Sequence, residues 1–433
     1  MASRRSPRAS SRSRGVGDER AVGRGRGGGR ERGHRGRAAR APGALRARAR
    51  GARGHHLGAS ARECATAIAA GSGPVALDAE RASGYRYGQR AYLVQVRRED
   101  AGTWLIDPIA LPDLSPLDRA IGSAEWLLHA ATQDLPCLAE VGLRPRQLFD
   151  TELAARLLGL PRVGLAAVVE HYLGLSLAKE HSAVDWSTRP LPEPWLRYAA
   201  LDVEVLAEVR NLMGVDLAVQ GKSDWAREEF DSLLSWQPAV KDDPWRRTSG
   251  MHKIRKPRVL ATVRELWYAR DQIAQERDVS PGRVVPDAAL VAIAIASPRS
   301  PADLPTSPRS VPRYGRQWIA AVERARELSD DELPAASVKG DGPPPQRSWA
   351  DRNPLAAARL TATREQLTAF AEEHSIPVEN VCAPDPLRRV VWTPPPVHDE
   401  SAFAGALAGH GVRPWQQAIV APMLAAAFAA NPD

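Results

Sequence analysis

The stretch that most restricts the fold of this chain is a short apolar run that ends in two acids. It reads Val-Ala-Leu-Asp-Ala-Glu over residues 75–80, with a Gly-Ser-Gly-Pro turn before it at 71–74 and Gly84 after it. The run predicts a buried strand between two turns. Because side chains alternate along a strand, Asp78 and Glu80 would share one face and could converge on a cation. Alone, the pair fits a solvated strand end equally well, so the rest of the chain must decide.

Strand and helix patterns divide the chain into a mixed first part and helical later parts. Between residues 57 and 215 the strand patterns come first, at 75–80, 91–96, 103–107, 125–130 and 147–150. Helical periodicity follows them, most clearly at 153–158, 165–172 and 195–213. This order predicts one mixed sheet with helices packed against it, an α/β domain.

The remainder of the chain predicts helical modules joined by connectors. Residues 216–256 read as a helix plus a connector, and 257–333 as a compact helical bundle. A linker rich in Gly and Pro follows at 334–350, and a second helical segment at 351–431.

The net charge of +8 comes from one end of the chain. Residues 1–56 hold 17 Arg and three acids, a net charge of +14, which leaves −6 for the rest. This extension has almost no large apolar side chains, so it predicts disorder. An Arg-rich tail could grip phosphates without sequence preference, or it could be a dispensable extension.

Cysteine usage and hydropathy indicate a cytoplasmic protein. The three cysteines are Cys64, Cys137 and Cys382, an odd number at wide spacing that fits neither a disulfide framework nor a zinc site. The longest apolar runs are too short to span a bilayer, and residues 1–56 contain no apolar signal segment.

Two further groups of polar residues could join the acids of the first strand. Residues 129–134 close a predicted strand and open a helix, which puts Asp134 in a first helical turn where the helix dipole favours a carboxylate. An ordinary helix N-terminal acid would look the same. Tyr198 and Asp202 lie four residues apart in a helical stretch, so they share one face.

Together these pieces resemble the DEDD exonuclease superfamily, in its tyrosine-bearing ribonuclease D branch. Asp78 and Glu80 match the first motif, Asp134 the second, and Tyr198 with Asp202 the third. The likeness covers about residues 70–215, and the supporting stretches are 148–154 and 181–191. It implies a ribonuclease-H-like, mixed-sheet exonuclease core.

The resemblance also implies a metal-dependent hydrolysis with two divalent cations, Mg²⁺ or Mn²⁺. Asp78 would contact both cations, Glu80 and Asp202 would complete the inner ligands, and Asp134 would act largely through bound water. Tyr198 would hold the attacking water, and with an ordinary phenol pKa of about 10 it would orient that water more than deprotonate it.

Other residues near these motifs have more modest expected roles. His129 is expected to be a packed, hydrogen-bonded histidine, and Asp150 a residue that orients its neighbours. Ala79 stands where many relatives have Thr, and Arg81 where an apolar or aromatic residue is common. These two departures leave the substrate preference open.

Residues 257–333 resemble the HRDC module, a small helical domain that binds nucleic acid. The likeness is carried by residues 263–271 and 284–290, and residues 351–431 resemble a degenerate second copy. These motifs are also compatible with a bundle that only spaces or caps the nuclease. A basic strip beside the first module is a candidate RNA contact: Lys253, Arg255, Lys256, Arg258 and Arg264.

The expected function is a 3′-to-5′ exoribonuclease that trims RNA 3′ ends, such as those of tRNA precursors, and releases nucleoside 5′-monophosphates. A DNA exonuclease of the proofreading or repair type, acting on single-stranded DNA, remains an alternative because the contact to the 2′-hydroxyl cannot be identified. A noncatalytic RNA-binding scaffold is a third hypothesis, and it predicts an incomplete carboxylate set. No membrane and no obligate protein partner are expected.

Overall fold

The computed structural model describes residues 56–57, 60–177, 181, 183–239, 242–337 and 340–432. The extension predicted at residues 1–56 lies outside the described residues except for His56. Within the described ranges, no helix combines the length and the apolar character needed to cross a bilayer.

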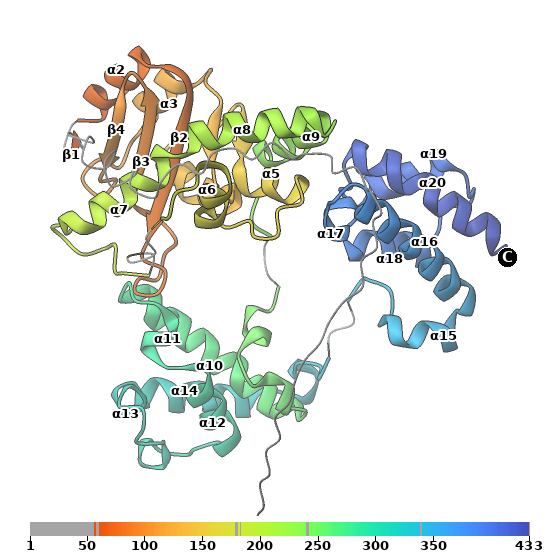
Figure 1. The fold of residues 1–433 in the computed structure, drawn as a ribbon. Coiled ribbons are helices and arrows are strands. Elements are labelled where there is room, and N and C mark those ends of the chain that lie inside the picture. The colour runs from red at the N-terminus through yellow and green to blue at the C-terminus, as the bar shows by residue number, and fades with distance from the viewer. Residues whose placement is uncertain are drawn as a thin grey trace, which may run out of the picture. The chain divides into compact units, whose positions relative to one another are not determined.

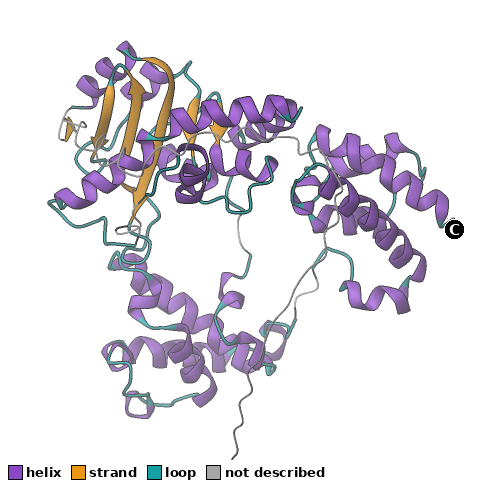
Figure 2. Ribbon diagram, viewed as in Figure 1, coloured by secondary structure: helices purple, strands orange, loops and turns teal. Residues whose placement is uncertain are grey.

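One six-stranded sheet forms the first part of the chain, in the order β1-β4-β3-β2-β5-β6 (Figure 1; Figure 2). Strand β2 pairs antiparallel with β3, and β3 with β4, whereas the other three pairs are parallel. The mixed sheet predicted from the sequence is therefore confirmed, and β2, an interior strand, carries both acids of the first motif. The strands are β1 (His56–Leu57), β2 (Ser72–Arg81), β3 (Ala91–Glu99), β4 (Gly102–Ile106), β5 (Trp126–Leu128) and β6 (Leu148–Asp150).

The two faces of the sheet bury different side chains. On one face α7 packs apolar and small residues against Leu93 of β3 and Leu105 of β4. The alternate residues of β3, Val94 and Val96, face the core that includes α2 and α3. The helices of this part are α2 (Ala61–Ala70), α3 (Ser115–Ile121), α4 (Leu135–Glu140), α5 (Thr151–Leu157), α6 (Leu165–Leu173), α7 (Glu193–Glu204), α8 (Leu206–Val219) and α9 (Ser223–Leu234).

Three local features differ from the sequence-based prediction. The single helix expected across 195–213 is two helices, α7 and α8, separated at Val205. The break occurs where the buried side chains change from the group that faces β3 and β4 to the larger core of the sheet. Strand β1 and helix α2 are absent from the prediction, although Ser60 and Glu63 form the capping box that marks the start of α2.

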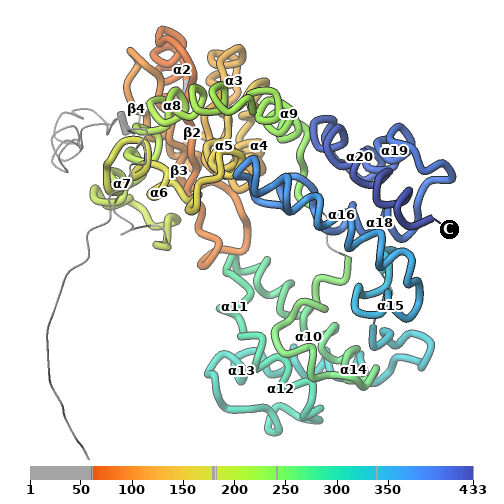
Figure 3. The backbone as a smooth tube through the Cα atoms, turned by 45° about the vertical axis from the view of Figure 1, so that its right-hand side comes forward, coloured from red at the N-terminus to blue at the C-terminus, as the bar shows by residue number. Residues whose placement is uncertain are grey.

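The predicted helical modules are present as two further groups of helices. The first has its own core, in which Trp245 and Ile254 pack with residues of α10 to α14. The bounds in this group are α10 (Pro257–Glu276), α11 (Pro281–Val284), α12 (Asp287–Ala296), α13 (Ser310–Arg313) and α14 (Gly315–Glu327). The second group, whose path is shown as a tube in Figure 3, comprises α15 (Trp349–Arg352), α16 (Pro354–Glu373), α17 (Val378–Val381), α18 (Pro384–Trp392), α19 (Glu400–Ala408) and α20 (Pro414–Ala430).

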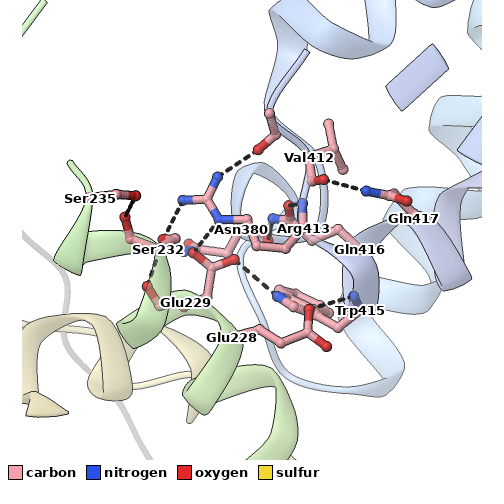
Figure 4. A network of polar contacts seen from close by, with 11 residues as sticks. Glu228, Glu229, Ser232, Ser235, Asn380, Val412, Arg413, Trp415, Gln416 and Gln417 are labelled. Carbon is pink, nitrogen blue, oxygen red and sulfur yellow. Dashed lines mark hydrogen bonds and ion pairs between the residues drawn. The ribbon is translucent and has the colours of Figure 1, made fainter. Parts of the chain in front are cut away.

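Polar contacts join the last helical group to α9 (Figure 4). The Trp415 indole donates to Glu229 at 3.0 Å, and the Trp415 backbone N–H donates to Glu228 at 2.8 Å. Arg413 lies 3.2 Å from Glu229 in an ion pair and donates to Ser232. The rings of Trp225 and Trp415 stack with centroids 4.8 Å apart. These contacts anchor the start of α20 on α9.

Lys222 makes a second connection between the same parts of the chain. Its side chain is buried, and Nζ donates to the carbonyls of Leu157 at 2.7 Å and His374 at 2.6 Å. These carbonyls lie at the C-terminal ends of α5 and α16, where a cation is favourable.

We expect Lys222→Met to lower the melting temperature by about 5 °C, because two helix-terminal carbonyls lose a charged donor and the net loss is about 2 kcal/mol. Thermal denaturation of the variant beside Lys256→Met, which changes an exposed lysine, is the measurement. Equal melting temperatures for the two variants would contradict a role for Lys222 in this connection.

Candidate active site

Three carboxylates from two elements converge at the end of β2. Asp78 and Glu80 lie on one face of the strand, and Asp202 reaches them from α7. One oxygen from each of Asp78, Glu80 and Asp202 lies within 4.8 Å of the others. Tyr198 lies one helical turn before Asp202, close enough for its phenol to interact with that carboxylate. The side-chain alternation of β2 and the i, i+4 spacing of α7 therefore produce the cluster.

Asp134 lies in the wall of the same pocket and outside the group of three. It follows a 3₁₀ turn, Ala131–Gln133, and precedes α4; its side chain is buried and caps neither element. The Arg81 guanidinium lies 3.8 Å from the Asp134 carboxylate and donates to Gln133 at 3.4 Å. All five predicted site residues thus line one cavity.

Asp150 fixes the turn that leads to Asp134. Its carboxylate accepts hydrogen bonds from the backbone N–H groups of Ala130 at 3.1 Å and Ala131 at 2.8 Å. It also caps α5 by accepting from Glu152 and Leu153. Ala130 has φ of +60°, so these bonds stabilise an uncommon backbone conformation. Asp150 orients its neighbours, in agreement with the sequence analysis.

His129 is a packed histidine, also in agreement with the sequence analysis. Its Nδ1 lies 2.9 Å from the Thr151 hydroxyl, and that hydroxyl donates to the carbonyl of Leu128. Burial lowers the pKa of His129 to about 4, so the ring is neutral at physiological pH. His129 therefore supplies no positive charge to the pocket.

The pocket has a volume of about 330 Å³ and adjoins a second one of about 340 Å³. Ala79, Glu80 and Arg81 line both, so the end of β2 forms the ridge between them. The first is lined by Asp78, Ala79, Glu80, Arg81, His129, Ala130, Gln133, Asp134, Glu152, Gly164, Tyr198 and Asp202. The second continues along Ser83, Gly84, Tyr85, Ala183 and Val184.

The carboxylates are held together against their mutual repulsion. Burial raises the pKa of Asp78 to about 6, of Asp202 to about 8 and of Glu80 to about 10, and raises that of Asp134 well above its usual range. Repulsion by neighbouring carboxylates is a second cause of the raised pKa of Glu80, Asp134 and Asp202, whereas Arg81 lowers the pKa of Asp78, Glu80 and Asp134. One guanidinium offsets only part of this repulsion, so the pocket favours protons or additional cations.

The donor set fits a hard divalent cation. Asp78, Glu80 and Asp202 offer oxygen ligands close enough to share an ion, and carboxylate oxygens are the ligands that Mg²⁺ and Mn²⁺ prefer. Burial and nearby carboxylates raise the pKa of Tyr198 above its usual value, so the phenol keeps its proton at neutral pH.

The loop between β2 and β3 contacts the first helical group, a connection that the sequence did not reveal. Ser280 donates its backbone N–H to the carbonyl of Tyr85 and its hydroxyl to the carbonyl of Gly84, at 3.0 and 3.1 Å. Arg283 also donates to Gly84 and lies over the Tyr85 ring, 4.2 Å from its centroid. Helix α11 and its N-cap residue therefore help to fix one wall of the second cavity.

The predicted basic strip is partly engaged in contacts within its own module. Arg258 donates to Asp330 at 2.8 Å and to the carbonyl of Leu328, and Arg264 pairs with Glu265 at 3.3 Å. The exposed members are Lys253, Arg255 and Lys256. Only these three fit the prediction of a solvent-facing strip.

Family comparisons agree with the division into a nuclease core and helical modules. Residues 59–218 match the family model described as 3′-5′ exonuclease, 259–322 match the HRDC domain, and 342–428 match the 3′ to 5′ exonuclease C-terminal domain. The interpretation of 351–431 as a second HRDC copy stays a prediction. The ribonuclease-H-like core followed by helical modules is confirmed, and with the acidic pocket it defines a 3′-to-5′ exonuclease.

Similar proteins and similar solved structures identify the family to which the chain belongs. Ribonuclease D of Nitrobacter hamburgensis is 32% identical over 311 residues, 69% of this chain and 76% of its own length, and that of Escherichia coli is 30% identical over 314 residues, 70% and 80%. The chain belongs to the ribonuclease D family, whose members are 3′-to-5′ exoribonucleases. A crystal structure of a protein from Bifidobacterium adolescentis matches with a TM-score of 0.77 and 38% identity over 85% of this chain and 94% of that one. That of E. coli RNase D matches with a TM-score of 0.62 and 26% identity over 86% and 97%.

Proposed function

We propose that Asp78, Glu80, Asp134 and Asp202 hold two divalent cations, Mg²⁺ or Mn²⁺, and with Tyr198 hydrolyse the 3′-terminal phosphodiester of RNA. The products would be a nucleoside 5′-monophosphate and a chain one nucleotide shorter. The observation that supports this proposal is the carboxylate cluster, in which burial raises each pKa, neighbouring carboxylates add to the rise for Glu80, Asp134 and Asp202, and one guanidinium offsets only part of it. Such a pocket gains stability by taking up cations.

The residues have separable roles in this proposal. Asp78 lies in the group of three and would serve both cations, Glu80 and Asp202 would complete the direct ligands, and Asp134, outside that group, would act through water. When bound, the cations would stabilise charge on the scissile phosphate and increase the acidity of water. Tyr198, which keeps its proton, would orient the attacking water by hydrogen bonding.

The substrate class that we propose is structured RNA, and the specific substrates that we propose within it are tRNA precursors. The support is the similarity to E. coli RNase D, described as an exoribonuclease involved in structured RNA processing. The adjoining cavities of about 330 and 340 Å³ are each of a size that can hold a small ligand such as a nucleotide. A cytoplasmic location is part of the proposal and is supported by three buried free cysteines.

Digestion of 5′-end-labelled RNA by the purified protein tests the proposal, with Mg²⁺ or Mn²⁺ and with Asp202→Asn as control. The expected result is a ladder that shortens from the 3′ end in the unmutated sample alone. A DNA substrate of matched sequence tests the alternative that the protein is a DNA exonuclease. Degradation of the DNA with no degradation of the RNA would support this alternative. If the protein bound RNA but cleaved neither the RNA nor the DNA substrate, the result would support the noncatalytic scaffold.

Replacement of Arg81 is predicted to change the affinities for Mn²⁺ and for RNA in opposite directions. Its guanidinium lies beside Asp134 and lines both cavities, so it competes with cations for the carboxylates and can meet the phosphate of a bound RNA. We expect Arg81→Met to tighten Mn²⁺ binding and to weaken RNA binding by about tenfold, the effect of a lost charge-assisted contact of roughly 1.5 kcal/mol.

Calorimetric titration with Mn²⁺ and fluorescence anisotropy with labelled RNA measure the two effects separately. Arg86→Met is the matched control, because Arg86 pairs with Asp278 at 3.6 Å and lines neither cavity. If Arg81→Met left Mn²⁺ binding unchanged or weakened it, the competition between Arg81 and the cations would be disproved.

A further inference from the structure

Gln95 is a fully buried amide without a hydrogen-bond partner. It lies on β3 with 0% of its surface exposed, and neither Oε1 nor Nε2 has a partner among the described residues. A buried amide that leaves both groups unpaired is costly, and in native structures such a group calls for a specific explanation. The explanation for the unpaired amide must therefore lie in the residues that surround Gln95.

The strand register places Gln95 beside the carboxylate cluster. In the antiparallel pair β2–β3, Gln95 is directly opposite Asp78. Opposite residues of an antiparallel pair point to the same face, with Cβ atoms about 5 Å apart. The Gln95 side chain therefore lies on the face that carries Asp78.

The pairing of β3 with β4 places the Gln95 side chain on the same face of the sheet, independently of β2. Across the β3–β4 pair, Gln95 is opposite Leu105, which packs with Ala199 and Ala200 of α7. Helix α7 also supplies Asp202 to the carboxylate cluster. The amide is thus enclosed between the sheet and the helix whose residues form the pocket.

We propose that Gln95 is a positioning residue of the cation site, whose amide hydrogen-bonds to the Asp78 carboxylate once the cations are bound. This inference rests on the proposed function. Groups that hold a ligand carboxylate by hydrogen bonding fix its orientation and change metal affinity by about 10- to 100-fold. An amide suits this position because it donates a hydrogen bond without adding charge to a pocket that is already lined by five acids.

A rival explanation is a buried water that serves only the core. Trp186 belongs to the packing group of Leu93, Leu105 and α7, and its Nε1 is also buried without a partner. A water shared by Trp186 and Gln95 would satisfy both groups. This rival predicts that loss of the amide lowers the stability of the metal-free protein and leaves metal affinity unchanged.

The test compares Gln95→Met, which keeps the length and removes both polar atoms, with Leu105→Met on the adjacent strand. Calorimetric titration of the full chain with Mn²⁺ and melting in EDTA are the readouts. We expect Mn²⁺ binding to weaken about tenfold in Gln95→Met, with the EDTA melting temperature unchanged or higher. We also expect kcat to fall with KM for RNA unchanged, whereas Leu105→Met should match the unmutated protein in Mn²⁺ affinity.

Each other outcome counts against a defined part of the proposal. Unchanged Mn²⁺ affinity in Gln95→Met overturns the role of Gln95. A lower EDTA melting temperature, or failure of the variant to fold, shows that the amide is needed without metal and selects the structural water. An unmutated protein that binds no Mn²⁺ in the pocket would instead disprove the proposed function.

Discussion

Replacement of Asp78 by Asn is expected to reduce kcat for release of the 3′-terminal nucleotide by about a thousandfold. Asp78 belongs to the group of three carboxylates, with Glu80 and Asp202, whose oxygens lie within 4.8 Å of one another. An amide at this position removes the ligand that we propose both cations share, and a loss of about 4 kcal/mol of transition-state stabilisation corresponds to that factor. The substitution also removes repulsion, so the metal-free variant should be at least as stable as the unmutated protein.

Single-turnover cleavage of end-labelled RNA measures the effect, with melting in EDTA as a measure of folding. Asp100→Asn is the matched control, because Asp100 lies in the turn at the opposite end of the β2–β3 pair and has φ of +65°, which Asn tolerates. Activity of Asp78→Asn within tenfold of Asp100→Asn would exclude Asp78 from the reaction.

The stabilisation by divalent cations is expected to increase strongly between pH 6 and pH 8. Burial raises the pKa of Asp202 to about 8 and of Glu80 to about 10, whereas in the unfolded chain both carboxyls ionise near about 4. Without metal, the folded state therefore holds more protons than the unfolded state above about pH 4, and its stability falls as pH rises towards these folded pKa values. Between pH 6 and pH 8, one carboxyl that stays protonated in the folded state lowers the free energy of unfolding by about 2 to 3 kcal/mol.

Cations replace the protons, so Mg²⁺ should offset this loss and its effect should be small at pH 6 and larger at pH 8. Melting temperatures at both pH values, in EDTA and in saturating Mg²⁺, measure it. Glu80→Gln removes one titrating group and should flatten the dependence in EDTA. A stabilisation by Mg²⁺ that is equal at pH 6 and pH 8, or that falls with pH, would contradict a cluster of protonated carboxyls.

The sequence predicted a mixed sheet from β2 to β6, without β1, and it predicted five site residues that line one cavity in the structure. Their placement depends on local periodicity: alternation along β2 puts Asp78 and Glu80 on one face, and the helical repeat does the same for Tyr198 and Asp202. The resemblance to the DEDD exonuclease superfamily then implied that these elements meet. Asp134 depends less on local pattern, because its turn is held by Asp150, which arrives from a different strand.

The remaining features depend on contacts between segments far apart in the chain. Ser280 meets the loop at Gly84 and Tyr85 across almost 200 positions, and no periodicity in either stretch indicates it. Lys222 looks like an exposed lysine between helices, yet it is buried against His374. Gln95 is one polar residue in an apolar strand, and only the register shows that it lies opposite Asp78.

The location of Mn²⁺ in crystals of the full chain tests the central claim most directly. Anomalous scattering from crystals grown with Mn²⁺ is expected to show two peaks among Asp78, Glu80, Asp134 and Asp202, and neither peak at full height in crystals of Asp78→Asn. Crystals that hold no Mn²⁺ in this pocket, at a concentration of Mn²⁺ that supports full cleavage of RNA, would contradict the account.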